Sequence, residues 1–375
     1  MAELGSHPAR SIAIFLPDLR PGGAEKLHVG LAADWCRRGV PVDFVLRQAR
    51  GALLDAVPDG ARVIDLGAKR VRNALRPLVR YLRKDRPSAL LAAMWPLTFI
   101  APVAARLSRF EGRVVVSEHA PQSISYAKHG GMHNALMSRS MKVAYRLVSA
   151  RVAVSSGVAE DLARLASVQR AKITVIHNPA ATGRFYTPTS VTCPFPAGVR
   201  PVIMTVGTLK PVKRHDVLIR AFAKLEDPDA RLCIVGDGPE RQRLESLTNE
   251  LGLSGRVLMP GFQSDPGPWY AHADLFVLTS EYEGFGNVLV EALEQGTPVV
   301  STDCPFGPRE ILENGRFGTL VPVGDVDALA VAMKVALSSA HDRAALMRRA
   351  ADFSLEKAST AYLDLLLPGW RGGFA

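Results

Sequence analysis

Cysteine is scarce in this chain: four of its 375 residues are cysteines, and no two of them form a Cys-x-x-Cys pair. This scarcity argues against a disulfide framework and against a zinc site, and it favours a reducing cytoplasm. Residues 1–10 contain no apolar run of the kind that a secretory signal carries, so we expect no export. The chain also lacks an internal repeat and a low-complexity tract.

The sequence also lacks three patterns that would indicate a metal site, a dinucleotide cofactor or a membrane span. No Asp-x-Asp pair sits at the end of an expected strand, so there is no obvious carboxylate cage for Mg²⁺ or Mn²⁺. The stretch Val235–Glu240 contains Gly-x-Gly, but Arg241 stands where a third glycine would complete a dinucleotide fingerprint, which argues against a nicotinamide cofactor. Residues 88–105 carry no charge, yet Pro96 and Pro102 divide them into a buried strand and a short helix, so we expect no membrane span.

The length and composition indicate a folded protein with two domains. Strand and helix patterns alternate along the chain, which predicts two doubly wound α/β domains with parallel sheets. The proline-rich stretch 177–201 has no clear periodicity and is typical of a linker. We therefore expect a first domain over residues 1–184, a second over 185–355, and a C-terminal helical segment over 356–375. The expected strands lie near residues 11–17, 40–46, 62–66, 89–95, 113–117, 151–154, 173–176, 202–206, 231–235, 256–259, 275–278, 298–301 and 319–322.

The most informative stretch runs from Ser280 to Leu293. An apolar strand leads into a loop with two glycines, and a helix is expected to begin at about Asn287. Gly284 and Gly286 allow the backbone to bend sharply and to approach a ligand closely. The unpaired N–H groups and the positive dipole end of the new helix suit a phosphate group.

Two carboxylates, Glu283 and Glu291, flank this anion site. They would repel a phosphate unless they face an uncharged hydroxylated group such as a ribose or a sugar ring, so the pattern points to a nucleotide sugar. The sequence Glu-Gly-Phe-Gly-x-x-x-x-Glu-Ala resembles the Glu-x7-Glu motif of the retaining glycosyltransferases of family 4. The resemblance covers nearly the whole chain. It implies a GT-B fold, in which two Rossmann-like domains face each other across a cleft, with Glu283 at the donor sugar and Glu291 at the ribose.

The stretch Val206–Lys213 is a second candidate segment, because cations beside a helix start can neutralise a departing diphosphate. The family usually shows Gly-Arg-Leu-x-x-x-Lys here. Lys213 matches that lysine, but Thr208 stands where the arginine is expected. Either Lys210 or Arg214 supplies the second cation, or the diphosphate is held less firmly.

Three further features resemble the family. Asp18–Glu25 contains the paired glycines Gly22 and Gly23 at an expected helix start, close to where donor phosphates lie in the family. Thr302–Glu310 is similar to a segment of members that use UDP-sugars. His119 follows a strand at its carboxyl end, where a neutral or charged imidazole can polarise an acceptor hydroxyl; a purely structural histidine is the alternative.

Positive charge is concentrated in the front half, with 28 Lys and Arg against 13 Asp and Glu in residues 1–184, whereas the remainder has 18 against 23. Basic helical faces suit an anionic membrane surface, at about 1 kcal/mol per basic residue near the lipid. No nucleic-acid reader module accompanies the charge, so no nucleic acid is expected, and a solvated face is the alternative. The expected membrane or acceptor face consists of Arg72, Arg76, Arg80 and Arg83, placed on one side of a helix, together with Arg139, Lys142 and Arg146.

These features predict transfer of a hexose or N-acetylhexosamine from a nucleoside-diphosphate sugar, with UDP favoured, to a lipid-linked or cell-surface glycan such as a polyprenyl-diphosphate-linked acceptor. We expect the enzyme at the cytoplasmic face of the inner membrane, with residues 121–134 as a mobile loop that admits the acceptor. A nucleotide-sugar epimerase and a non-catalytic subunit of a polysaccharide assembly complex are the alternatives. The expected catalytic residues are Glu283, Lys213 and His119; the donor is expected to bind Gly22, Gly23, Thr208, Lys210, Gly284, Phe285, Gly286, Asn287, Val288 and Glu291, with no metal and no cofactor.

Overall fold

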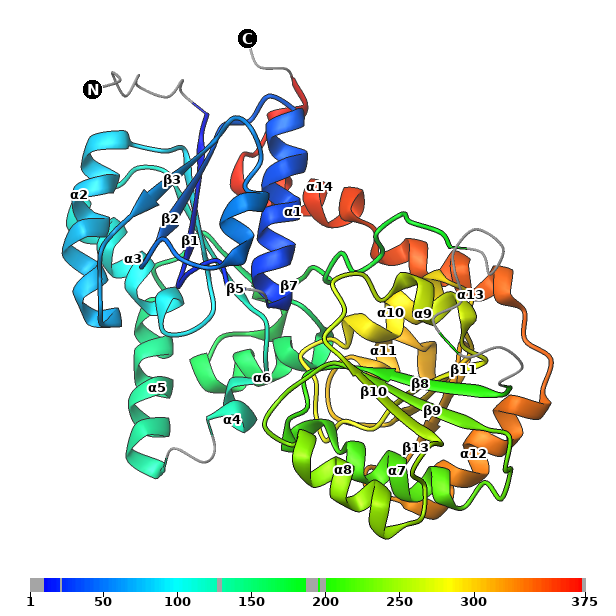
Figure 1. Ribbon diagram of the computed structural model, residues 1–375. Helices are drawn as coiled ribbons and strands as arrows, with labels where there is room; N and C mark the ends of the chain where they lie inside the picture. Colours follow the sequence, from blue (N-terminus) through cyan, green and yellow to red (C-terminus); the bar gives the residue numbers. More distant parts are fainter. Residues whose placement is uncertain (1–9, 21, 127–129, 187–194, 196–199, 373–375) are drawn as a thin grey trace. The chain divides into compact units, whose positions relative to one another are not determined.

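The computed structural model describes residues 10–20, 22–126, 130–186, 195 and 200–372. It divides into two compact units, unit 1 with residues 1–179 and 355–375 and unit 2 with residues 180–354. Each unit carries a parallel sheet with helices on both faces (Figure 1), so the α/β class and the two Rossmann-like domains predicted from the sequence are confirmed.

The sheet of unit 1 has the strand order β3-β2-β1-β4-β5-β6-β7 within the described residues, and every pair of neighbours is parallel. The central strands are buried along their whole length, as expected for a sheet covered on both faces. The strands are β1 (Ile12–Leu16), β2 (Val42–Leu46), β3 (Ala61–Asp65), β4 (Ala89–Ala93), β5 (Arg113–Glu118), β6 (Ala150–Ala153) and β7 (Thr174–Val175).

The helices of unit 1 form two layers. Figure 1 shows α1 and α14 on one face of the sheet, where they pack against each other, and α2 beside α3 on the other face. Helix α3 contacts both α2 and α5, so these three helices lie side by side. The helices are α1 (Gly23–Arg37), α2 (Leu75–Asp85), α3 (Leu97–Ser108), α4 (Gln122–Ser125), α5 (Gly131–Ala144), α6 (Ser156–Ala166) and α14 (Leu355–Leu366).

Unit 2 is built in the same way around the strand order β10-β9-β8-β11-β12-β13, again parallel throughout. One helix layer contains α7, α8 and α12, and the other contains α9, α10, α11 and α13 (Figure 1). The strands are β8 (Val202–Val206), β9 (Arg231–Val235), β10 (Val257–Gly261), β11 (Leu275–Leu278), β12 (Val299–Thr302) and β13 (Thr319–Val321). The helices are α7 (His215–Ala223), α8 (Arg241–Glu250), α9 (Gly267–His272), α10 (Asn287–Glu294), α11 (Pro308–Ile311), α12 (Val326–Ser338) and α13 (Arg343–Ala350).

Several helix starts follow from short polar side chains. The Ser155 hydroxyl accepts a hydrogen bond from the N–H of Val158 at the start of α6, at 3.2 Å. Asp325 and Asp342 accept N–H groups three residues ahead in the same way at the starts of α12 and α13, both at 2.9 Å. Each cap satisfies a backbone donor that the first helical turn leaves unpaired.

The C-terminal helix α14 belongs to unit 1 although it follows unit 2 in the sequence. The hydroxyl of its Tyr362 lies 2.8 Å from the Ser117 hydroxyl at the end of β5, and Arg113 donates a hydrogen bond to the carbonyl of Leu365 at 2.7 Å. Ser359 is hydrogen-bonded to Asp34 of α1. Unit 2 is therefore an insertion whose ends meet, because Ala181 and Ser354 form a parallel bridge.

Each strand expected from the sequence has a counterpart, and the uncharged residues 88–105 are divided between β4 and α3 as predicted. Among the described residues, no helix has the length and apolar character needed to cross a membrane. The expectation of a loop over residues 121–134 is wrong at two places. Residues 122–125 form α4 and residues from Gly131 onward form α5, while residues 127–129 lie outside the described residues.

Candidate functional site

Glu283 lies in the loop between β11 and α10, at the carboxyl end of the unit 2 sheet. Its Oε1 accepts a hydrogen bond from the Ser280 hydroxyl at 2.6 Å and lies 2.6 Å from the Lys213 ammonium. Ser280 is completely buried, and the side chain of Glu283 is 12% exposed. The carboxylate is therefore fixed through one oxygen by a buried hydroxyl and by a cation.

Lys213 comes from the loop after β8, which is joined to the Glu283 loop through its backbone. The Thr279 hydroxyl donates to the carbonyl of Lys213 at 2.8 Å, and the N–H of Glu281 donates to the carbonyl of Val212 at 2.8 Å. The Lys213 stem passes Gly207, where an added Cβ would make ordinary van der Waals contact with Cε of Lys213 at 3.7 Å. The structure thus brings Lys213 and Glu283 together, 70 residues apart in the sequence.

The loop after β12 closes over the same region. The N–H of Glu283 donates to the carbonyl of Pro305 at 3.3 Å. Gly307 has φ of +95°, and a Cβ at this position would lie 1.7 Å from the carbonyl oxygen of Phe285. Only glycine accepts both the backbone angle and this close approach. Cys304 is buried in this loop, and burial, followed by the charge of Glu283, raises the pKa of its thiol to about 12.

Helix α10 begins where the sequence predicts, directly after Gly286, which adopts φ of +101°. Asn287 and Val288 form its first turn and are partly exposed. The ring of Phe285 is only 2% exposed and packs edge-on against Phe353 at 5.3 Å, so its backbone and not its ring is available to a ligand. Gly284 is partly exposed beside it.

Glu291, one turn into α10, accepts a hydrogen bond from the hydroxyl of Tyr270 at 2.9 Å. Tyr270 belongs to α9 and is 1% exposed. Burial, and then the charge of Glu291, raises the pKa of Tyr270 well above its ordinary value, so its hydroxyl keeps the proton that it donates. Neither Tyr270 nor Ser280 was among the residues expected from the sequence.

The two candidates for the second cation differ in their surroundings. Arg214 contacts Asp216 and Glu281, each at 3.1 Å. Lys210 is exposed, and among the described residues it forms no ion pair. Thr208, in the position where the family carries arginine, is exposed as well. Among the described cations of this loop, Lys210 is therefore the one that can bind an anion without first leaving a carboxylate, because Lys213 and Arg214 both contact carboxylates.

In unit 1, the paired glycines stand at the start of α1 as predicted, with Gly22 as the residue before the helix and Gly23 as its first residue. The Glu25 carboxylate folds back over this start, since a Cβ at Gly22 would lie 2.2 Å from its Oε2. Burial raises the pKa of Glu25. An anion at this helix start therefore requires the Glu25 side chain to move or to take up a proton.

His119 follows β5 directly, at the carboxyl end of the unit 1 sheet. Its ring meets that of His28 edge-on, with 5.3 Å between the centroids, and its Nε2 lies 3.1 Å from the Ser117 hydroxyl. Burial, together with the neighbouring His28, holds the pKa of His119 well below its ordinary value. The imidazole is therefore neutral near pH 7.

Glu118 precedes His119 and is completely buried. Its carboxyl group accepts hydrogen bonds from Thr98 and Gln122, both at 2.7 Å, and from the hydroxyl of Tyr145. Burial raises the pKa of Glu118 although these hydrogen bonds act in the opposite direction. This network ties α3, α4 and α5 to the strand end that carries His119.

The basic residues expected on one helical face are divided in the structure. Arg76, Arg80 and Arg83 are exposed on α2, but Arg72 lies in the 3₁₀ turn η2 (Val71–Ala74), so its placement on the same helix was wrong. Helix α2 begins only at Leu75, because proline is tolerated in the first turn of a helix and Pro77 occupies that turn. The second set, Arg139, Lys142 and Arg146, is exposed on α5 and the turn after it.

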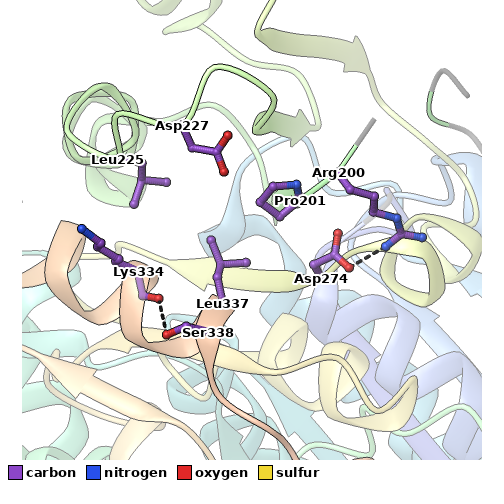
Figure 2. Close-up of a pocket in the computed structure, with 8 residues that line it drawn as sticks. All are labelled: Arg200, Pro201, Leu225, Asp227, Asp274, Lys334, Leu337 and Ser338. Carbon is purple, nitrogen blue, oxygen red and sulfur yellow. Dashed lines mark hydrogen bonds and ion pairs between the residues drawn. The ribbon is translucent and has the colours of Figure 1, made fainter. Parts of the chain in front are cut away.

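A separate hollow of about 500 Å³ lies at the opposite edge of the unit 2 sheet. Figure 2 shows Asp227 and Leu337 beside it and the ion pair between Arg200 and Asp274 at one side. Pro201 directly precedes β8, so this hollow is at the amino end of the strands and away from Glu283. Among the described residues, no group of three or more His, Cys, Asp or Glu side chains is arranged to hold a metal ion.

Two parallel-sheet domains, with a Glu-containing loop and a helix start at the carboxyl end of the second sheet, define the architecture of the GT-B glycosyltransferases. Comparison with solved structures agrees. The structure of Anabaena Alr3699/HepE in complex with UDP matches with a TM-score of 0.77 at 22% identity, covering 95% of this chain and 99% of that one. The apo form of the lipopolysaccharide outer core galactosyltransferase WaaB matches with a TM-score of 0.72 at 20% identity, covering 95% and 98%.

Sequence comparison gives the family. The family model described as "Glycosyltransferase Family 4" matches residues 21–184, and "Glycosyl transferases group 1" matches residues 196–353. The lipopolysaccharide core biosynthesis glycosyltransferase LpsE of Rhizobium meliloti (strain 1021) is 32% identical over 362 residues, which cover 92% of this chain and 96% of the relative. LpsD of the same organism is 28% identical, covering 92% and 94%. The chain belongs to the family 4 glycosyltransferases of the GT-B fold.

Proposed function

We propose that this glycosyltransferase moves a hexose or N-acetylhexosamine from a UDP-sugar to a glycan acceptor carried by a lipid, with retention of the anomeric configuration. In this proposal unit 2 binds the donor and unit 1 binds the acceptor. The observation that carries it is the cluster of Glu283, Ser280 and Lys213 at the carboxyl end of the unit 2 sheet, beside the start of α10.

The cluster suits a sugar diphosphate because it offers opposite charges at adjacent points. An ammonium group has three donors, so Lys213 can hold Glu283 with one and phosphate oxygens with the others. Oε1 of Glu283 is engaged with Ser280 and Lys213, which leaves Oε2 to accept hydroxyl groups of the donor sugar. The first amides of α10, at Asn287 and Val288, would add N–H donors and the helix dipole to the diphosphate.

The nucleotide end of the donor would lie along α10. Glu291 is one turn further into the helix, where its carboxylate can accept the two ribose hydroxyls. Tyr270 fixes that carboxylate from the buried side. Lys210 would supply the second cation that Thr208 does not, since it is exposed in the same loop as Lys213.

In the reaction, the bond between the anomeric carbon and the phosphate oxygen breaks, and the nucleoside diphosphate leaves with the electron pair. The acceptor hydroxyl forms its bond to the anomeric carbon on the face from which the diphosphate departs. Its proton passes to the departing phosphate oxygen, so no side chain acts as a base. Lys213 and the α10 amides stabilise the negative charge that develops on the diphosphate, which is the main electrostatic task in such a step.

In unit 1, the neutral imidazole of His119 would donate or accept a hydrogen bond at the reacting sugars, and the Gly22–Gly23 start of α1 would approach the donor phosphates. The names of the relatives support a lipid-linked acceptor. LpsE and LpsD act in lipopolysaccharide core biosynthesis, and a Campylobacter jejuni relative at 30% identity is a transferase named for a diphospho-undecaprenol acceptor. We therefore place the enzyme at the cytoplasmic face of a membrane, bound to it peripherally.

The test combines donor binding with turnover. Thermal shift against a panel of UDP- and GDP-sugars identifies the donor, because a ligand that binds only the folded state raises its stability by mass action. Donor turnover is then measured for wild type, for Glu283→Gln and for Glu250→Gln, a control at an exposed position at the end of α8. We expect a loss of about 100-fold or more in Glu283→Gln, as for removal of a group aimed at transition-state charge, and no loss in the control.

Two outcomes would replace this proposal. Conversion of the donor into an isomer without release of nucleoside diphosphate would indicate an epimerase. Donor binding without turnover in the presence of membrane-extracted acceptors, with Glu283→Gln indistinguishable from wild type, would indicate a non-catalytic subunit. A product with inverted anomeric configuration would refute the same-face attack.

A further inference from the structure

Helix α5 exposes large apolar side chains that a soluble surface does not require. Leu136 is 66% exposed, Val143 is 60% exposed, and Leu147 in the following turn is 44% exposed. These residues are seven and four apart, so they fall on one side of the helix. The N–H of Leu147 donates to the carbonyl of Ala144 at 3.0 Å and continues the helical path. We call Leu136, Val143 and Leu147 the α5 strip.

The opposite side of α5 is already buried against the rest of unit 1, so the α5 strip cannot be buried there. Met137, Met141 and Tyr145 are buried, with exposures of 1%, 0% and 0%. Ser138 donates a hydrogen bond to the carbonyl of Leu165 at the end of α6, at 2.9 Å. The helix already packs against unit 1 with a complete apolar face, and the α5 strip is a second apolar surface that faces solvent.

Cations border the α5 strip. Arg139, Lys142 and Arg146 are three and four residues apart and exposed, and none of them forms an ion pair with a carboxylate in the described part of the chain. The sequence contains no Asp or Glu between Glu118 and Glu160. An apolar strip beside unpaired cations, with no acidic residue along the segment, is the pattern of a helix that lies in the headgroup region of an anionic membrane.

Helix α2, the other basic helix, lacks this combination. Its cations Arg76 and Arg80 are exposed, but its large apolar side chains Leu78 and Leu82 are buried. Leu75, Arg76, Val79, Arg80, Arg83, Lys84 and Leu107 line a hollow of about 720 Å³ there, in which only Leu107 is an exposed large apolar residue. The face of α2 can attract anionic lipid only through charge, and salt screens such attraction.

We propose that α5 is the element that docks the enzyme on an anionic lipid surface, with Leu136, Val143 and Leu147 inserted at the level of the headgroups and Arg139, Lys142 and Arg146 on lipid phosphates. The long stems of the Arg and Lys residues allow their charged ends to reach the phosphates while the strip is buried. This inference deepens the membrane association proposed above. It does not depend on the donor chemistry, so the two can fail separately.

The experiment measures binding of the full chain to phosphatidylcholine vesicles with and without phosphatidylglycerol, at low and high NaCl. Three triple variants are compared with wild type: Leu136→Ser/Val143→Ser/Leu147→Ser in the strip, Arg139→Ser/Lys142→Ser/Arg146→Ser on α5, and Arg76→Ser/Arg80→Ser/Arg83→Ser on α2 as the matched charge control. All nine side chains are exposed, so we expect the variants to fold, and thermal unfolding checks this.

We expect wild type to bind only the vesicles with phosphatidylglycerol. The strip variant should lose at least tenfold in affinity, and the α5 charge variant about fivefold for each cation removed. The strip variant should keep the wild-type thermal shift with the donor, which separates a docking defect from a catalytic one. Three results would overturn the inference: no vesicle binding by wild type, full binding by the strip variant, or a wild-type dimer in light scattering that the strip variant dissolves, which would make the strip an interface between two copies.

Discussion

Replacing Ser280 by alanine gives the sharpest test of the candidate site, because it removes one oxygen atom and nothing else. The Ser280 hydroxyl is completely buried and donates to Glu283 at 2.6 Å. Without this hydroxyl, Oε1 of Glu283 would keep Lys213 as its partner and lose its buried donor. The carboxylate would then be free to rotate away from the position that we assign to the donor sugar.

The expected magnitude follows from the type of bond. A hydrogen bond to a charged group contributes about 1.5–3 kcal/mol, and about 1.4 kcal/mol corresponds to a factor of ten in rate. We therefore expect kcat/KM of Ser280→Ala to fall by about 10- to 100-fold. Ser301 of β12 provides a control, because it is equally buried and donates to the carbonyl of Thr302 at 2.9 Å instead of to Glu283.

The assay compares steady-state release of nucleoside diphosphate by wild type, Ser280→Ala and Ser301→Ala, together with their thermal unfolding. Ser301→Ala should lose about 1 kcal/mol of stability, and Ser280→Ala about 1.5–3 kcal/mol, since the Ser280 hydrogen bond is made to a charged group. Only Ser280→Ala should lose activity. Equal activity in the two folded variants would refute the positioning role of Ser280 and count against the assignment of Glu283.

Three further predictions concern other parts of the structure. Gly307→Ala should lower the free energy of unfolding by about 2–4 kcal/mol and weaken donor binding, because the new Cβ would collide with a backbone oxygen. Gly252→Ala is the control: this glycine has φ of +67° but open space around it, so the substitution should lower the free energy of unfolding by only about 1 kcal/mol. Urea unfolding measures both variants. Tyr270→Phe should weaken nucleoside-diphosphate binding by about fivefold in calorimetry through loss of its hydrogen bond to Glu291, and an unchanged affinity would contradict the ribose assignment. Burial lowers the pKa of His28 from 6.5 to about 4, so the unfolded chain takes up this proton first as the pH falls. His28 should therefore contribute about 3 kcal/mol to the loss of unfolding free energy between about pH 6.5 and pH 4, and His28→Gln should show a loss smaller by that amount in urea unfolding at the two pH values.

The elements that the sequence predicted well are those whose signal is local. The start of α10 at Asn287 was predicted because two glycines precede that helix, and a helical segment was predicted over residues 356–375, where α14 (Leu355–Leu366) lies. Lys213 and Glu283 were predicted as partners of one ligand from a family pattern. Their 2.6 Å contact could not be predicted, because the two loops that carry them are brought together only by the order of the strands in the sheet.

The predictions that failed depend on competing local signals. Residues 121–134, which contain Gly130 and Gly131, were interpreted as a loop, but Gly130 with φ of +89° directly precedes α5 and Gly131 is its first residue. The helical face expected for Arg139 and Lys142 lies on α5, so only the start of this helix was missed. Tyr270 could not be predicted at all, because its partner Glu291 is 21 residues away and meets it only after α9 and α10 have packed.

Unit 2 starts and ends near the Ala181–Ser354 bridge. This has a consequence for engineering the enzyme and for the divergence of its relatives. Residues 180–354 are one continuous segment of the chain, and its two ends are neighbours in space. Recombination with a relative can therefore exchange the whole of unit 2 at this junction while unit 1 keeps both of its segments. Truncation just before Leu355 has the opposite effect, since it removes Tyr362 and Leu363 from the interior of unit 1 and leaves that unit with an open core.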